Sequence, residues 1–295
     1  MSNQVMSSTS VEKPMSLDTR PSPIAGQWYP GDPKKLAASV DSYLDQAGAA
    51  AIPGDVVALM SPHAGHLYCG AVAGKAYAAV RGLRPDVVAV ISPCHYPYYQ
   101  PLITTAHAAY QTPLGAVPVD GPRLQALDAA LRTELGFGLT AVKRDPEHSL
   151  EIELPFLQRA LAGEFHLLPV MVRDQGRRTV FALGQALAKL LAGSNFLLVA
   201  STDLSHFYTE REANQLDAEF LRRVEAFDPE AALNAEDEGK AFACGRAAVA
   251  AVLWAARALG ADTVKVSGYA TSGDVTGDRS QVVGYGAAVV FRSKS

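Results

Sequence analysis

The amino-acid sequence predicts a single-domain α/β protein with a central, mostly parallel or mixed sheet flanked by helices. Nearly continuous apolar runs, typical of strands covered on both faces, alternate along the chain with segments of helical periodicity. Short polar loops join the two kinds of segment, which is the pattern of an α/β fold. No low-complexity linker divides residues 20–292, so we expect one domain over residues 20–293, preceded by a disordered tail over residues 1–19.

The strands are predicted from apolar runs and from the residues that bound them. Four nearly continuous apolar runs indicate buried strands, at residues 55–61, 86–92, 165–172 and 195–201. The chain closes with two further β-rich segments, 263–271 and 281–291. Weak alternation over residues 101–119 fits short strands or a hairpin at the edge of the sheet.

The helices are predicted from apolar periodicity and from start signals. An aspartate followed by proline, a typical N-cap with proline at the first helical position, occurs at Asp32 and again at Asp145. The first helix should cover residues 33–47, and the second should bend at Pro155. Helical periodicity predicts further helices at residues 71–81, 121–134, 177–192, 209–226 and 229–238, and from Phe242 onward.

Composition and charge exclude several classes of protein. The chain has 295 residues, of which 48% are hydrophobic, and a formal net charge of −4, so it offers no basic surface for nucleic acid or an anionic membrane. Three cysteines without paired spacing favour a reducing compartment over a disulfide framework. No apolar run reaches the roughly 18–20 residues that a membrane span requires. We therefore expect a cytoplasmic protein that binds neither nucleic acid nor membranes.

Three histidines follow the ends of predicted buried strands: His63, His95 and His206. Because parallel strands place their carboxyl ends on one side of a sheet, these side chains can converge. Imidazole is the commonest neutral metal ligand and also an acid or base near neutral pH. Convergence would therefore form a metal or acid–base site, and separate structural roles for the histidines are the alternative.

Cys244 is the candidate for an anionic third ligand. It falls at a predicted helix N-terminus, where the helix dipole lowers the pKa of a thiol. Two histidines and one anionic ligand leave positions open for substrate or dioxygen, and a thiolate favours Cu(I), zinc or iron over magnesium or calcium. A buried, inert cysteine is one alternative. A Cys₂His₂ zinc site that uses Cys69 and Cys94 is another, although the spacing is not that of a zinc finger or ribbon.

Two polar residues are further candidates for the same site. Asp203 either orients an imidazole, accepts a hydrogen bond from Tyr68, or closes an Asx turn. His148 follows Glu147 in the first turn of its predicted helix, and either faces the site or caps the helix. The role of His66 stays open. No nucleotide-binding loop and no hydrolase nucleophile elbow is present in the sequence.

A series of motifs, in order along nearly all of residues 20–292, resembles the Memo family. The motifs are AGQWYP (25–30), SPHAGHLYCG (61–70), SPCHYP (92–97), PEHSLEIELPF (146–156), STDLSHF (201–207), ACGR (243–246) and the run from SGDVTGD to VVGYG. Bacterial and archaeal members of the family are often called AmmeMemoRadiSam system protein B. The resemblance implies a fold like that of class III extradiol dioxygenases, which hold Fe(II) with two histidines and a glutamate.

The resemblance also implies roles for individual residues. His63 and His95 match the two metal-binding histidines of the family, and Cys244 matches the cysteine that replaces the dioxygenase glutamate. His206 matches the histidine that serves as acid or base in the dioxygenases. The remaining two candidates, Asp203 and His148, match family positions that line the same cleft.

The implied function is metal-dependent redox activity with iron or copper, zinc being a further option. In prokaryotes the resemblance implies partnership with a radical-SAM protein and with AmmeMemoRadiSam system protein A. The alternative is a catalytically inactive binding module that uses the same cleft for a peptide or partner protein, since the animal relative is described as a phosphotyrosine-peptide binder. Two departures from the usual family pattern are His66, where an aromatic residue is common, and Cys94-His95-Tyr96, where Ser-His-His is common.

Overall fold

A computed structural model describes residues 18–48 and 51–294. The predicted tail lies outside the described residues up to residue 17, and Thr19 is the first residue of strand β1. The helices are α1 (Pro33–Ala47), α2 (His66–Tyr77), α3 (Gly121–Leu135), α4 (Leu154–Ala160), α5 (Arg177–Leu191), α6 (Glu210–Glu225), α7 (Pro229–Asn234), α8 (Arg246–Ala258) and α9 (Gly273–Thr276). The strands are β1 (Thr19–Arg20), β2 (Gly54–Ser61), β3 (Val87–Pro93), β4 (Leu102–Thr105), β5 (Ala109–Thr112), β6 (Gly115–Pro118), β7 (Thr140–Val142), β8 (His166–Val172), β9 (Phe196–Ser201), β10 (His206–Tyr208), β11 (Thr263–Thr271) and β12 (Val282–Ser293).

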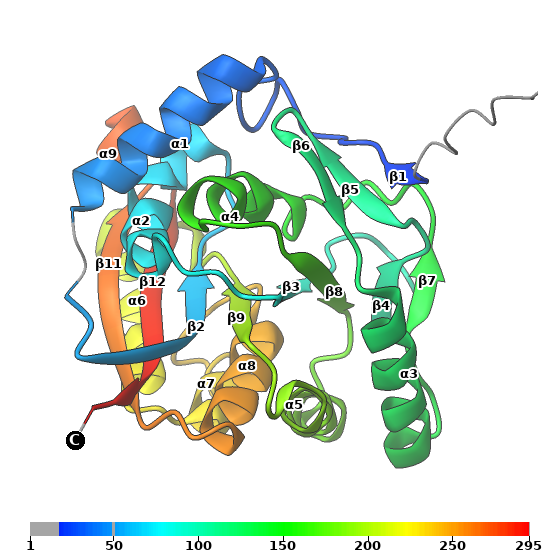
Figure 1. Cartoon of the computed structure of the whole chain (residues 1–295). Coiled ribbons are helices and arrows are strands. Elements are labelled where there is room, and N and C mark those ends of the chain that lie inside the picture. Colours follow the sequence, from blue (N-terminus) through cyan, green and yellow to red (C-terminus); the bar gives the residue numbers. More distant parts are fainter. Residues whose placement is uncertain (1–17, 49–50, 295) are drawn as a thin grey trace, which may run out of the picture.

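A large mixed sheet separates two layers of helices (Figure 1). Its strands follow the order β10-β12-β2-β9-β3-β8-β4-β7, and β11 pairs with β12. The neighbours β2, β9, β3 and β8 are parallel to one another. Strand β12 pairs antiparallel with β2, and β4 pairs antiparallel with β8. The hairpin of β5 and β6 joins β1 in a small second sheet. The predicted α/β fold with a mixed sheet is therefore confirmed.

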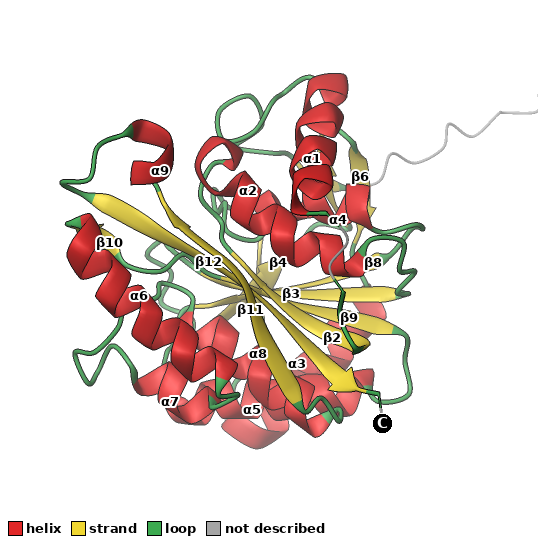
Figure 2. Ribbon diagram, turned by 90° about the vertical axis from the view of Figure 1, so that its left-hand side faces the viewer, coloured by secondary structure: helices red, strands yellow, loops and turns green. Residues whose placement is uncertain are grey.

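Each face of the sheet is covered by its own helices (Figure 2). Helices α1, α2 and α4 lie on one face, and α3, α5, α6, α7 and α8 lie on the other. In β3, Val88 and Val90 pack into the apolar cluster of the first layer, whereas Val87, Ala89 and Ile91 pack into that of the second. Because successive side chains of a strand point to opposite faces, a strand covered on both sides is apolar at every position.

The structure corrects two predicted boundaries near the site. Helix α2 begins at His66, so the end of the predicted loop 61–70 is helical. The helix expected from Asp145 is absent there: the chain stays irregular until a short 3-10 helix at Glu151–Glu153, and α4 follows. The buried Arg20 holds the carboxylate and carbonyl of Asp145, which therefore does not cap a helix. Pro155 lies in the first turn of α4, where proline is tolerated, and does not bend the helix.

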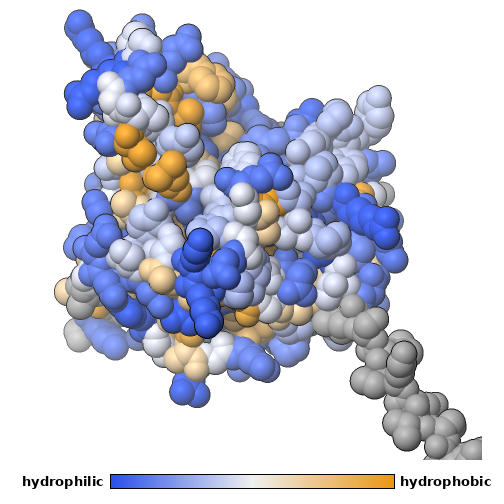
Figure 3. All heavy atoms as spheres, turned by 90° about the horizontal axis from the view of Figure 1, so that it is seen from above, coloured by the Kyte–Doolittle hydropathy of each residue, from blue (hydrophilic) through white to orange (hydrophobic). Residues whose placement is uncertain are grey.

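The surface of the described part of the chain is mixed in character. On the face seen from above in Figure 3, hydrophobic side chains form small separate groups among hydrophilic ones. None of the helices within residues 18–48 and 51–294 has the length and apolar character of a membrane span.

Candidate metal-binding cleft

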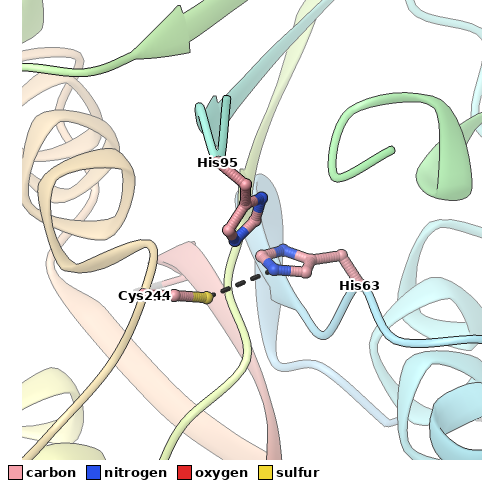
Figure 4. A group of neighbouring side chains, drawn as sticks. All are labelled: His63, His95 and Cys244. Atoms are coloured by element: carbon pink, nitrogen blue, oxygen red, sulfur yellow. Dashed lines mark hydrogen bonds between the residues drawn. The ribbon is translucent and has the colours of Figure 1, made fainter. Parts of the chain in front are cut away.

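Two histidines and one cysteine from distant parts of the sequence meet beyond the ends of the parallel strands. His63 follows β2, His95 follows β3, and Cys244 precedes α8; the three side chains point toward one another (Figure 4). Their potential ligand atoms all lie within 4.8 Å of one another. Cys244 Sγ is 3.2 Å from His63 Nε2, and the two imidazole centroids are 5.2 Å apart. The sheet order explains the meeting, because β9 lies between β2 and β3 and is parallel to both.

His63 presents Nε2 to the cysteine because its other ring nitrogen is engaged. Nδ1 lies 2.9 Å from the hydroxyl of Ser201, the last residue of β9. Burial, together with the nearby His95 and His148, lowers the pKa of His63 well below its usual value. The imidazole is therefore neutral at physiological pH, which is the form that binds metals.

His95 is oriented by a carboxylate. Its Nδ1 lies 3.0 Å from Oε1 of Glu147, whose other oxygen accepts a hydrogen bond from the His95 backbone amide. Burial opposes ionisation of Glu147, but hydrogen bonds from His95 and from the Ser149 amide lower its pKa to about 2. A carboxylate on Nδ1 fixes the ring of a metal-binding histidine and strengthens Nε2 as a donor. The sequence indicated Glu147 only as a neighbour of His148, and the signal for its role is its place within the PEHSLEIE motif.

Cys244 is held against the end of β9 by the glycine that follows it. The Gly245 amide donates to Thr202 Oγ1 at 2.9 Å, and a Cβ on Gly245 would lie 2.2 Å from the Ser201 carbonyl oxygen. Burial and the nearby Asp203 raise the pKa of the Cys244 thiol. The expected lowering of this pKa by a helix N-terminus is therefore wrong, because burial and the carboxyl group outweigh the dipole of a helix that begins only at Arg246.

Asp203 fixes the loop that carries His63. Its Oδ1 accepts hydrogen bonds from the backbone amides of His63, at 2.8 Å, and Ala64, at 3.3 Å. Its Oδ2 lies 4.0 Å from His63 Nε2, and burial raises the pKa of the carboxyl to about 7. The expected hydrogen bond from Tyr68 is not among the contacts of Asp203 in the described structure. Tyr68 is 41% exposed and lines the cleft.

A cleft of about 430 Å³ opens over these residues. Its lining brings together the candidates His63, His95, His148, Asp203 and His206 with Gln27, Trp28, Ala64, Gly65, Tyr68, Val283 and Tyr285. The sequence did not indicate Trp28 or Tyr285 as parts of the site, because a single aromatic residue in a mostly apolar chain is usually a core residue. The cleft is therefore lined by both imidazoles and aromatic rings.

His148 lines the cleft and does not cap a helix. Its ring stacks on His95 with a centroid distance of 4.8 Å, and it packs against Trp28 at 4.1 Å. Burial and the nearby His95 lower the pKa of His148 to about 4, against the opposing effect of Glu147. It is thus a neutral, flat surface beside the ligand atoms.

His206 enters the cleft from β10. Burial lowers its pKa, and its Nδ1 is buried without a hydrogen-bond partner. His206 is one of the residues that line the cleft. The next residue, Phe207, has a left-handed φ of 63° and is 69% exposed. This backbone conformation is unfavourable for phenylalanine, and such strain tends to occur at functional sites.

Three other candidates lie outside the cleft. His66 is buried between Tyr29 and Phe156, and its Nε2 lies 3.2 Å from the Ile152 carbonyl oxygen. Cys69 and Cys94 are also buried, and their sulfurs contact backbone carbonyls. In the described part of the chain the alternative Cys₂His₂ site is not assembled, since the clusters of potential ligands contain neither of these cysteines.

A family model and several related proteins place the chain in the same family. The family model for "Memo-like protein" matches residues 20–289. A MEMO1 family protein of Nitrosopumilus maritimus (strain SCM1) is 32% identical over 271 residues, which are 90% of this chain and 96% of the relative. The MEMO1 family protein of Thermotoga maritima is 33% identical over 279 residues, covering 91% of this chain and 98% of the relative. That of Methanosarcina mazei is 31% identical over 276 residues, covering 93% and 100%. The chain therefore belongs to the Memo-like protein family.

Proposed function

We propose that the cleft binds an iron or copper ion through His63, His95 and Cys244 and that the bound metal supports redox chemistry on a molecule held in the cleft. One observation carries the proposal. Each histidine has its Nδ1 engaged, by Ser201 or by Glu147, and the potential ligand atoms of both histidines and of Cys244 lie within 4.8 Å of one another.

The donor set fits these metals. Two imidazoles and one thiolate suit Cu(I), iron or zinc, whereas magnesium and calcium prefer oxygen ligands. Three protein ligands on one side leave further positions for a small molecule from the cleft. Cys244 binds as thiolate, so metal uptake displaces its proton. Zinc would occupy the same donors without redox activity, and the identity of the bound metal decides between these chemistries.

The surrounding residues have separate tasks. The metal, when bound, supplies one-electron chemistry and a Lewis acid. His206 gives or takes a proton, and Asp203 holds the loop of His63 in place. The rings of Trp28 and His148, packed against each other at a tilt of 38°, orient a flat group and keep water from one side of the cleft.

Ordinary ring cleavage, as in the class III extradiol dioxygenases to which the sequence motifs imply a likeness, is not part of the proposal. A thiolate donates more electron density to a metal than a carboxylate does, and activated oxygen oxidises it. Cys244 in the position of a ligand thus favours copper(I) binding or single-electron transfer.

Anaerobic reconstitution tests the proposal. The purified chain is stripped with a chelator and loaded separately with Fe(II), Cu(I) and Zn(II), and bound metal is counted by elemental analysis. We expect about one equivalent, with affinity lost in Cys244→Ser and His63→Ala and kept in Cys69→Ala, which removes a buried sulfur outside the cleft. Metal-free wild type after loading, or unchanged affinity in Cys244→Ser, would contradict the proposal.

The alternative is a catalytically inactive module that binds a peptide or partner protein in the cleft, and its phosphopeptide form has weaker support. Among the described residues that line the cleft there is no lysine or arginine to pair with a phosphate. Partnership with a radical-SAM protein and with AmmeMemoRadiSam system protein A stays a prediction. Co-purification of the chain with each protein, in the metal-loaded and metal-free forms, measures it.

A further inference from the structure

A line of buried polar groups runs from His63 into the protein interior. His63 Nδ1 lies 2.9 Å from Ser201 Oγ, which in turn lies 2.7 Å from Oε1 of Glu153. The hydroxyl of Tyr77 donates to the other carboxyl oxygen at 2.8 Å. All four side chains are at most 1% exposed. None of these supporting groups lines the cleft, so they act on the site only through His63.

The hydrogen count at Ser201 fixes the tautomer of His63. Ser201 Oγ also lies 2.7 Å from the carbonyl oxygen of Ser149, which can only accept. A serine hydroxyl has one proton and two lone pairs. That proton is taken by the carbonyl or shared with Glu153, and the contact with His63 is therefore made by a lone pair of Ser201. His63 must be the donor through Nδ1–H, which leaves Nε2 unprotonated.

Glu153 keeps the hydroxyl in this orientation. If the Ser149 carbonyl takes the hydroxyl proton, the contact between Ser201 and Glu153 is satisfied when the carboxyl group itself carries a proton. The buried surroundings of Glu153 agree with this, since they raise its pKa to about 8. The carboxyl, anchored on its other side by Tyr77, thus closes a network in which every member has a partner.

The neighbouring strands provide a comparison. β3 carries a buried serine, Ser92, just before its last residue, and β2 ends in Ser61. The hydroxyl of Ser92 turns back to the carbonyl of Pro93 at 3.1 Å. That of Ser61 lies 3.4 Å from the carbonyl of Pro62 and also interacts with Glu153 and Tyr77, but neither serine contacts an imidazole. The contact of Ser201 with an imidazole is thus not the usual behaviour of a serine at this level of the sheet.

We propose that Ser201, held by Glu153, is a positioning residue that locks His63 in the Nδ1–H tautomer and so presents Nε2 to the metal. This inference rests on the proposed metal site. It adds Ser201 and Glu153 to that site, although neither lines the cleft. Glu147 performs the corresponding task for His95 with a carboxylate, so the two histidines are supported by groups of different charge.

Two measurements on the full-length chain test the inference. The first is anaerobic competition with a chromophoric chelator for Fe(II) and Cu(I). Ser201→Ala should weaken metal binding by roughly 10- to 100-fold, the usual effect of losing such a partner. Ser201→Thr, which keeps the hydroxyl, should restore binding to near the wild-type level. Ser92→Ala should leave it unchanged.

The second measurement needs no metal. Nitrogen-15 NMR of the apo protein reports which ring nitrogen of His63 carries the proton. We expect Nδ1–H in wild type and in Glu153→Gln, whose amide can donate to Ser201 as the acid does, and loss of this preference in Ser201→Ala. Glu153→Leu, if it folds, should resemble Ser201→Ala.

The outcomes separate the two proposals. If wild type takes up no metal, the proposed function fails, and the NMR result still decides the tautomer. If wild type binds metal but Ser201→Ala binds it equally well and keeps the Nδ1–H tautomer, Ser201 is not a positioning residue and the inference is overturned.

Discussion

The sulfur of Cys244 lies 3.2 Å from Nε2 of His63 across a separation of 181 residues in the sequence. Neither residue belongs to a regular element; one follows β2 and the other precedes α8. Strand β9 connects the two residues. Its last residue, Ser201, contacts the His63 ring through its side chain, and the Ser201 carbonyl oxygen lies against Gly245. The geometry of the cleft therefore depends on close packing around the end of one central strand.

Gly245→Ala should uncouple the cysteine from this packing. The added methyl group would lie 2.2 Å from the Ser201 carbonyl oxygen, so the loop has to move and Cys244 with it. We expect a loss of about 1–3 kcal/mol in unfolding free energy and at least a roughly tenfold loss of metal affinity. Chemical denaturation and metal titration measure the two effects. Gly121→Ala is the matched control, because a Cβ there meets nothing within 4 Å, and equal behaviour of both variants would contradict the packing argument.

The pH dependence of stability should report Glu153. Its pKa of about 8 in the folded chain lies above the ordinary value of 4.5, since burial favours the neutral form. Between these two pH values folding takes up a proton, so the contribution is fully present below about pH 4.5 and is lost as pH rises toward 8. Glu153→Gln cannot ionise, and its unfolding free energy should fall less over this interval, by up to ~1.4 kcal/mol per pH unit. Urea unfolding of both chelator-treated proteins at several pH values measures the difference; parallel curves would rule out the assignment.

Arg20 should be required for the loop that carries Glu147 and His148. It is 1% exposed and forms ion pairs with Asp145 and Glu151, and it donates to the Glu147 carbonyl at 2.6 Å. Arg20→Met leaves two buried carboxyl groups without their partner, which should cost about 3–5 kcal/mol of unfolding free energy.

An exposed ion pair provides the control for Arg20. Arg159 pairs with Asp41 at 2.6 Å, with both side chains partly in solvent. Arg159→Met should therefore cost less than about 1 kcal/mol. Arg20→Lys should not rescue the buried site, because lysine lacks the planar set of donors that arginine offers. If Arg20→Met and Arg159→Met lost similar amounts of unfolding free energy, the buried ion pairs would contribute no more to stability than an exposed one.

Phe207 should carry measurable backbone strain. Its left-handed φ of 63° is tolerated by asparagine far better than by alanine. Both Phe207→Asn and Phe207→Ala remove the exposed ring, so their comparison isolates the backbone term. We expect the asparagine variant to be more stable by about 1 kcal/mol in thermal and chemical unfolding. Equal stability would mean that the loop relaxes and stores no strain beside His206.

The sequence predicted the central strands and the longer helices, but not the short strands β7 and β10. Fully apolar runs are buried on both faces of a sheet, so the positions of β2, β3, β8 and β9 follow from composition alone. The family could be recognised because its motifs carry the residues of the cleft in a fixed order. Capping aspartate followed by proline located the start of α1 at Pro33 but gave the wrong result at Asp145, where the distant Arg20 competes for the carboxylate.

The sequence by itself determined that this is an α/β protein with histidines just after strand ends. Only the tertiary structure decided which of these groups meet, which nitrogen of each ring is free, and that burial raises the pKa of Cys244. The physical reason is the separation along the chain of the residues that interact. Strand and helix patterns are set by neighbours in the chain, whereas Ser201, Glu147 and Glu153 act on the cleft through contacts about 50 to 140 residues away, which no local pattern encodes.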